Sequence, residues 1–215
     1  MTSGLFETIA SLGMSTDSLG FAIAPAIVLE NLDSLGEGRV KLRVPSRPGF
    51  EPWARVVAVG GGPDHGLYWM PQVDDEVLAA FHQGDERNAF VLGGLWNAKD
   101  HPPIDSPSDA LNKRILRTGI GSAPGHVVEF DDAEQAIRVT SSTGHKVTIE
   151  PDKIELQNGP GTVKITMDSA GQSIVMEAIT SIELKSKGRI LLEGMSIDIK
   201  GTGVTSVSGQ LVKIN

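Results

Sequence analysis

The sequence predicts an all-β protein built of many short strands. Its 215 residues include 25 glycines, which supply the positive φ angles that tight turns require. No long stretch shows the apolar spacing of a helix, whereas Val40, Leu42 and Val44 alternate with basic residues in the two-residue period of a strand. The two halves of the chain differ in character, which at this length favours two domains.

Residues 1–20 are expected to form an arm, and residues 21–98 a small closed barrel of the OB type. The arm has room for one short amphipathic helix. About five short strands then follow in roughly 75 residues, a density typical of a closed barrel without exposed sheet edges. The expected strand-like runs are 21–32, 38–44, 53–59, 66–70, 76–81 and 89–92. Residues assigned to the barrel interior include Val73, Val77, Phe81 and Val91.

Residues 99–124 are expected to link the barrel to a second domain. Their first part, residues 99–107, contains three prolines and three charged residues and has no apolar periodicity.

Residues 125–215 are predicted to form a needle, a triple-stranded β-helix made by three chains. Apolar residues recur two apart along this part, and the spacing between runs narrows to seven residues from Ile190 onward. A single ribbon of this kind would leave a wide apolar face in water. Three copies around one axis would turn these faces inward and pair the strand edges between chains. The expected trimer core includes Ile154, Leu156, Ile182, Leu184, Ile197 and Ile199.

Composition and residue spacing argue against catalysis, metal binding and nucleic-acid binding. The net charge of -8 opposes binding to nucleic acid, and the absence of cysteine excludes disulfides, thiol catalysis and cysteine zinc sites. The five histidines are scattered, and Asp131 and Asp132 are interpreted as a solvated turn because adjacent strand side chains point to opposite faces. We therefore predict no catalytic residue, no metal site and no cofactor, and the protein is not expected to be an enzyme.

Four segments carry a resemblance to a known family. They are residues 66–78 (GLYWMPQVDDEVL), continued by 81–85 (FHQGD) and 91–97 (VLGGLWN), and residues 125–132 (GHVVEFDD). The first three segments resemble the barrel signature of phage baseplate assembly protein V and of the VgrG spikes of type VI secretion. The last resembles the segment that opens the β-needle in those proteins. The resemblance spans roughly residues 21–215.

The resemblance implies a structural spike of a contractile injection system or phage tail, which caps the tube and pierces a target envelope. Only about twenty residues precede the barrel, whereas full-length VgrG proteins carry a large hub domain there, so a separate baseplate hub protein is implied. Such a spike is expected to assemble in the bacterial cytoplasm into a phage-tail-like particle and to reach the target envelope on contraction. Phage tail, tailocin, extracellular particle and membrane-anchored system all remain open.

The end of the needle is expected to be a blunt platform for a separate tip protein of the PAAR type. Residues 201–212 carry no charge, and no histidine follows His145 that could hold a metal at a point. The predicted seat for the tip protein consists of Leu211, Val212 and Ile214.

Two other functions compete with the spike. An OB-fold nucleic-acid-binding protein would need a basic groove with stacked aromatics, yet 19 Lys and Arg stand against 27 Asp and Glu, and aromatics make up 5%. A glycan-binding β-helical tail fibre would need aromatic platforms or paired carboxylates on its shaft, and Phe130 is the only aromatic residue after His126.

Overall fold

The computed structural model describes residues 23–82, 85, 87–119 and 123–213. Within them the protein is all-β apart from the short helix α3 (Asp109–Asn112), which confirms the predicted class. The expected arm at residues 1–20 and the predicted seat residue Ile214 lie outside the described residues.

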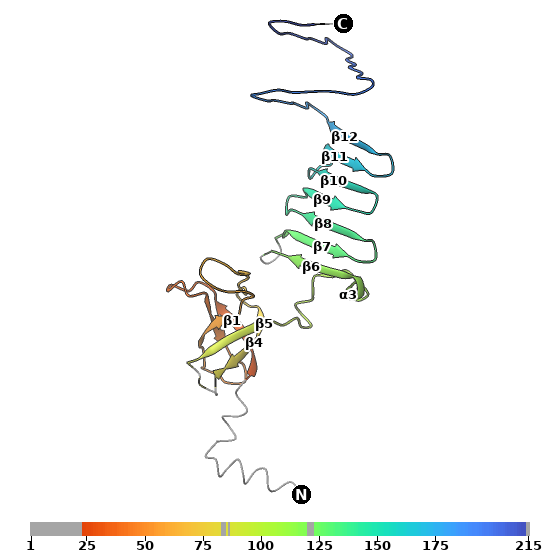
Figure 1. The fold of residues 1–215 in the computed structure, drawn as a ribbon. Helices are drawn as coiled ribbons and strands as arrows, with labels where there is room; N and C mark the ends of the chain where they lie inside the picture. Colours follow the sequence, from red (N-terminus) through yellow and green to blue (C-terminus); the bar gives the residue numbers. More distant parts are fainter. Residues whose placement is uncertain (1–22, 83–84, 86, 120–122, 214–215) are drawn as a thin grey trace, which may run out of the picture.

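Five strands close into a barrel near the start of the described chain (Figure 1). They are β1 (Ile23–Glu30), β2 (Arg39–Arg43), β3 (Trp53–Val56), β4 (Glu76–Phe81) and β5 (Ala89–Gly94). The order around the barrel is β1-β2-β3-β5-β4, and only β3 and β5 run parallel among these pairs. This closed barrel confirms the OB-type fold, and closure leaves no open sheet edge.

The barrel interior follows from strand alternation. Val40, Leu42 and Val44 are fully buried, and so are Val77 and Val91. The predicted interior position of Phe81 is also correct, since this side chain is 3% exposed. The prediction for Val73 is wrong, because this residue is 49% exposed.

The expected strand at residues 66–70 does not form. Here the chain makes an isolated bridge between Gly62 and His65, and the Leu67 amide donates to the Val59 carbonyl 3.0 Å away. Gly66 has a φ of 130°, which strains any other residue, and a Cβ there would lie only 3.0 Å from the Cα of Gly61. The run is therefore a tight loop folded on the preceding glycines.

The second part of the protein begins inside the stretch expected to be linker. Helix α3 leads directly into β6 (Lys113–Arg117), which pairs with β7 (Val127–Asp131). The sheet thus starts at Lys113 rather than at Gly125.

Seven strands stack in chain order like rungs (Figure 1). After β6 and β7 come β8 (Ala136–Thr140), β9 (Lys146–Ile149), β10 (Lys153–Gln157), β11 (Val163–Asp168) and β12 (Ser173–Ala178). Every neighbouring pair is antiparallel and belongs to the same chain. The expectation that strand edges pair between chains is therefore wrong for this part.

The tail, residues 179–213, contains no strand. It continues beyond β12, away from the stacked sheet (Figure 1). The runs around Ile182 and Ile197, which the periodicity marks as strands, form no strand and have no strand partner among the described residues.

Candidate functional surface of the seven-stranded sheet

One face of the sheet carries two columns of apolar side chains that run across the strands. In register, each apolar residue lies opposite another on the next strand, as Leu156 lies opposite both Val147 and Ile165. The first column is Phe130, Ile137, Ile149, Ile154, Met167 and Ile174. The second is Leu116, Val128, Val139, Val147, Leu156, Ile165 and Met176. We call this surface the apolar face.

The apolar face is more exposed than the charged face behind it. In β10, Ile154 and Leu156 are 36% and 46% exposed. The side chain of Glu155, which lies between them in sequence and points to the other face, is 19% exposed. A soluble sheet normally shows the reverse order, with apolar side chains inside. Within the described chain, nothing covers the apolar face.

A groove of about 480 Å³ lies on this face, near the turns that join successive strands at one end of the stack of strands. It is lined by apolar residues of the second column, such as Val139, Val147 and Leu156, and by His126 and His145. The two histidines link successive turns. The Ser142 amide donates to Nδ1 of His126, and the Gly159 amide donates to Nδ1 of His145, each over 3.2 Å.

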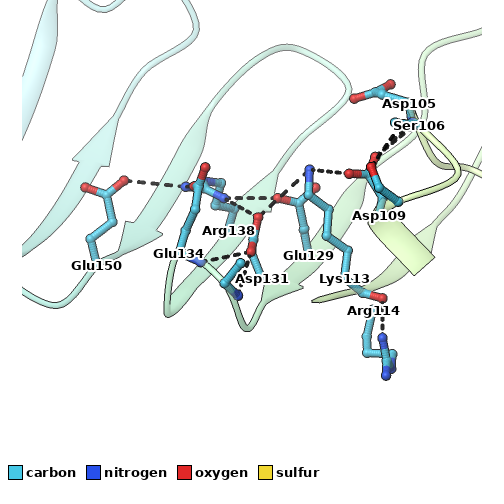
Figure 2. A network of polar contacts seen from close by, with 12 residues as sticks. Asp105, Ser106, Asp109, Lys113, Arg114, Glu129, Asp131, Glu134, Arg138 and Glu150 are labelled. Carbon is cyan, nitrogen blue, oxygen red and sulfur yellow. Dashed lines mark hydrogen bonds and ion pairs between the residues drawn. The ribbon is translucent and has the colours of Figure 1, made fainter. Parts of the chain in front are cut away.

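The opposite face is held by an ion network centred on Arg138 (Figure 2). The guanidinium bonds Oε1 of Glu129 at 3.1 Å and also bonds Glu134. It lies 3.7 Å from Glu150 and 3.9 Å from Asp131. Glu134 first, and then Glu129, raise the pKa of Arg138 further above its ordinary value. One arginine therefore ties together β7, β8 and the turn after β9.

Asp131 is the buried member of this network. Its side chain is 4% exposed and accepts the backbone amides of Ala133 and Glu134 at 3.1 and 3.0 Å. Lys113 lies 3.9 Å from Asp131 and 3.8 Å from Asp109, so it joins α3 to the first hairpin of the sheet (Figure 2). The interpretation of Asp131 as part of a solvated turn is wrong, although Asp132 is exposed.

Two more ion pairs extend the charged face along the stack. Lys164 of β11 lies 3.6 Å from Glu155 of β10, and Lys153 lies 3.4 Å from Glu150. The bond to Glu150 is the main reason why the pKa of Lys153 is raised. The charged face is thus self-sufficient within one chain, whereas the apolar face is not.

The structure brings together only part of the predicted trimer core. Ile154 and Leu156 lie in the two apolar columns. The other four, Ile182, Leu184, Ile197 and Ile199, lie in the tail and are all more than half exposed. Of the predicted tip seat, Leu211 and Val212 are 74% and 46% exposed. The role of each of these residues stays a prediction.

The network around Arg138 was missed by the sequence analysis. Its members lie between Asp109 and Glu150 and share no short motif. The available signal was the alternation of Glu129 and Asp131 on one strand, which places both carboxylates on the same face. In the described ranges, no group of three His, Asp or Glu side chains is arranged to hold a metal ion. No helix found in those ranges is long and apolar enough to cross a membrane.

Comparison with known proteins identifies the barrel. Residues 24–96 match the family of the type VI secretion system and phage-baseplate injector OB domain. The type VI secretion system spike protein VgrG3 of Vibrio cholerae is 27% identical over 128 residues, which are 55% of this chain and 12% of that protein.

Two further relatives match shorter parts. VgrG1a of Pseudomonas aeruginosa is 27% identical over 79 residues, covering 36% of this chain and 12% of that spike protein. The actin cross-linking toxin VgrG1 of Vibrio cholerae is 28% identical over 102 residues, covering 44% of this chain and 9% of the toxin. The chain thus matches only about an eighth or less of the length of these relatives. The chain is similar to VgrG-type baseplate and spike proteins, and its residues 24–96 match the family of the injector OB domain.

Proposed function

We propose that this protein is a structural, non-enzymatic spike in which three copies pack their apolar faces around one axis. The observation that carries the proposal is the reversed burial of the sheet, with apolar side chains outside and ion-paired side chains half-buried. An apolar surface that extends over seven strands needs a partner in water. A second and third copy supply the same surface.

The shape of the apolar face supports three copies. Strands β7 to β12 each contribute two apolar side chains to it and β6 contributes one, Leu116. Residues two apart on a strand are separated by about 7 Å. A face only two columns wide fits one side of a three-sided prism, in which each layer holds six side chains at the axis. The charged faces then lie outside, and the Arg138 network stays in water-accessible positions.

The mass of the purified protein tests this assembly. Light scattering is expected to give three times the chain mass of 22.8 kDa. Trimers should survive heat and detergent, because interfaces between chains make unfolding slow. A monodisperse folded monomer would contradict the proposal.

We also propose the place of this spike in an injection particle. The barrel faces a separate baseplate hub protein below the tube, and the needle points to the envelope it pierces on contraction. Support comes from the injector OB family and from relatives that are named type VI secretion spike proteins. The particle forms in the bacterial cytoplasm. Its components are expected to co-purify with the tagged spike from a producing cell.

A PAAR-type tip protein is the partner proposed for the end of the needle. Leu211 and Val212 are exposed apolar residues of the tail and, together with Ile214, would form its seat. Deleting residues 210–215 is expected to leave trimers intact but to abolish co-purification with the tip protein. Retention of the tip protein on the shortened spike would refute this seat.

A further inference from the structure

The sheet and the tail differ in where their backbone hydrogen bonds go. Strands β6 to β12 pair with their neighbours in the same chain, from Lys113 to Ala178. Among the described residues, the tail makes no backbone-to-backbone hydrogen bond at all. Unpaired backbone amides and carbonyls are tolerated in water but not beside a buried apolar surface.

The tail nevertheless carries apolar residues in strand-like alternation. Ile182 and Leu184, and again Ile197 and Ile199, are spaced two apart with polar residues between them, and all four are more than half exposed. The chain itself offers nothing to cover them, because the tail leads away from the sheet (Figure 1). The outer edge of β12, from Ser173 to Ala178, has no strand beside it in the described chain.

We propose that the tail folds only against the tails of the other two copies, starting on the outer edge of β12, after the three sheets have docked. The occupant of this edge is a second copy of the same chain. This inference rests on the trimer proposed above and adds an order of assembly to it. The sheet is the part that brings the three chains into register.

The order follows from what each part lacks. The sheet already has its turns, its backbone pairs and its ion network within one chain, so docking must supply only cover for the apolar face. The tail lacks both backbone partners and apolar cover, so its ordering costs backbone entropy at every residue before any contact forms. Docked sheets hold the three tails side by side and reduce the entropy of closing contacts between them.

Two aspartate substitutions separate the parts. Leu156→Asp puts three carboxylates on the axis between the sheets, and Ile197→Asp puts three in the tail. Each has a matched control that introduces aspartate beside it. Gln157→Asp lies on the charged face, where residue 157 pairs in register with Lys146 and Lys164, and Ser196→Asp lies next to Ile197 in the alternation.

We expect Leu156→Asp to give monomers whose tail amides exchange with solvent as fast as those of an unfolded chain. Ile197→Asp is expected to remain trimeric and to lose exchange protection only in the tail. Both controls should keep the trimer mass and a protected tail. All three tryptophans, Trp53, Trp69 and Trp96, precede the sheet, so their fluorescence shows separately whether the barrel of each variant is folded.

Other outcomes overturn the inference. If Ile197→Asp dissociates the trimer as fully as Leu156→Asp does, the sheet and tail assemble as one unit. If Leu156→Asp leaves the tail protected, the tail does not depend on the sheet. Should Leu156→Asp aggregate, Leu156→Ala replaces it, and tail protection must then fall in proportion to the fraction of trimer. A monomeric unmodified protein would instead refute the proposed trimer itself.

Discussion

The barrel and the seven-stranded sheet are both made of alternating strands, yet they bury opposite kinds of side chain. In the barrel, the alternation of β2 places Val40 and Leu42 at zero exposure and leaves the basic residues at the surface. In the sheet, the alternation of β10 leaves Leu156 exposed and half-buries Glu155. The difference lies in closure. A barrel covers its own apolar face, whereas an open stack of strands needs a partner to do so.

The largest effect is expected from a charge inside the barrel. Val77→Asp buries a carboxylate at a position with zero exposure and should cost more than about 4 kcal/mol in the free energy of unfolding. Urea unfolding followed by tryptophan fluorescence measures this loss. Val73→Asp is the control, because Val73 is 49% exposed and its replacement should cost little. Similar losses in both variants would show that the barrel interior is assigned wrongly.

A smaller loss of stability is expected when Arg138, the centre of the ion network, is replaced. Arg138→Gln removes the cation that contacts four carboxylates, among them the buried Asp131, and should destabilise the sheet by about 1–3 kcal/mol. Hydrogen exchange of β7 and β8 measures the effect. Lys164→Gln, which breaks a single ion pair with Glu155, is the milder control. Equal protection in both variants would mean that the network does not brace the sheet.

The sequence predicts the barrel better than the sheet for a physical reason. Alternation identifies which residues of β2 and β4 are buried, since both strands lie in a closed barrel. The same alternation cannot say whether a strand edge pairs within a chain or between chains, because both pairings produce the same pattern. Gly66 and Asp131 were misjudged for another reason. Gly66 lies in a loop that folds back on Gly61, and Asp131 is surrounded by Lys113 and Arg138 from the two neighbouring strands, so neither environment can be read from the local pattern.

Successive turns at one end of the strands stack closely, which predicts a further, local loss of stability. Gly159 lies against the Thr143 carbonyl, so a Cβ at this position would overlap the carbonyl oxygen. Gly159→Ala is expected to cost about 1–3 kcal/mol through a shift of the turn. The bend at Gly203 has no atom of the described chain within 4 Å of the position of a Cβ, which makes Gly203→Ala the control. Thermal unfolding of the two variants at equal concentration compares them, and indistinguishable midpoints would refute the close approach.

The smallest effect is a pH dependence confined to the barrel. The side chain of Asp33 is 5% exposed and bonds the Arg39 guanidinium through both carboxylate oxygens, at 2.9 and 3.0 Å. It also accepts the amides of Leu35, Glu37 and Arg39. The Arg39 guanidinium is the main cause that holds the pKa of Asp33 well below its ordinary value, and the amides lower it further. An aspartate in an unfolded chain titrates near pH 3.9, so the stabilisation is fully present above about pH 5 and is lost as the pH falls through the lower pKa of the folded state.

Asp33→Asn should therefore be less stable than the unmodified barrel at pH 7, and this difference in stability should narrow steadily below about pH 4. The Arg39 guanidinium lies 5.6 Å from the centre of the Trp53 ring, so tryptophan fluorescence in urea at pH 7, 5 and 3 follows the loop that Asp33 holds. Asp64→Asn, in an exposed turn, controls for the loss of one carboxylate. A gap for Asp33→Asn that is as wide at pH 3 as at pH 7 would show that the ion pair with Arg39 does not stabilise the barrel.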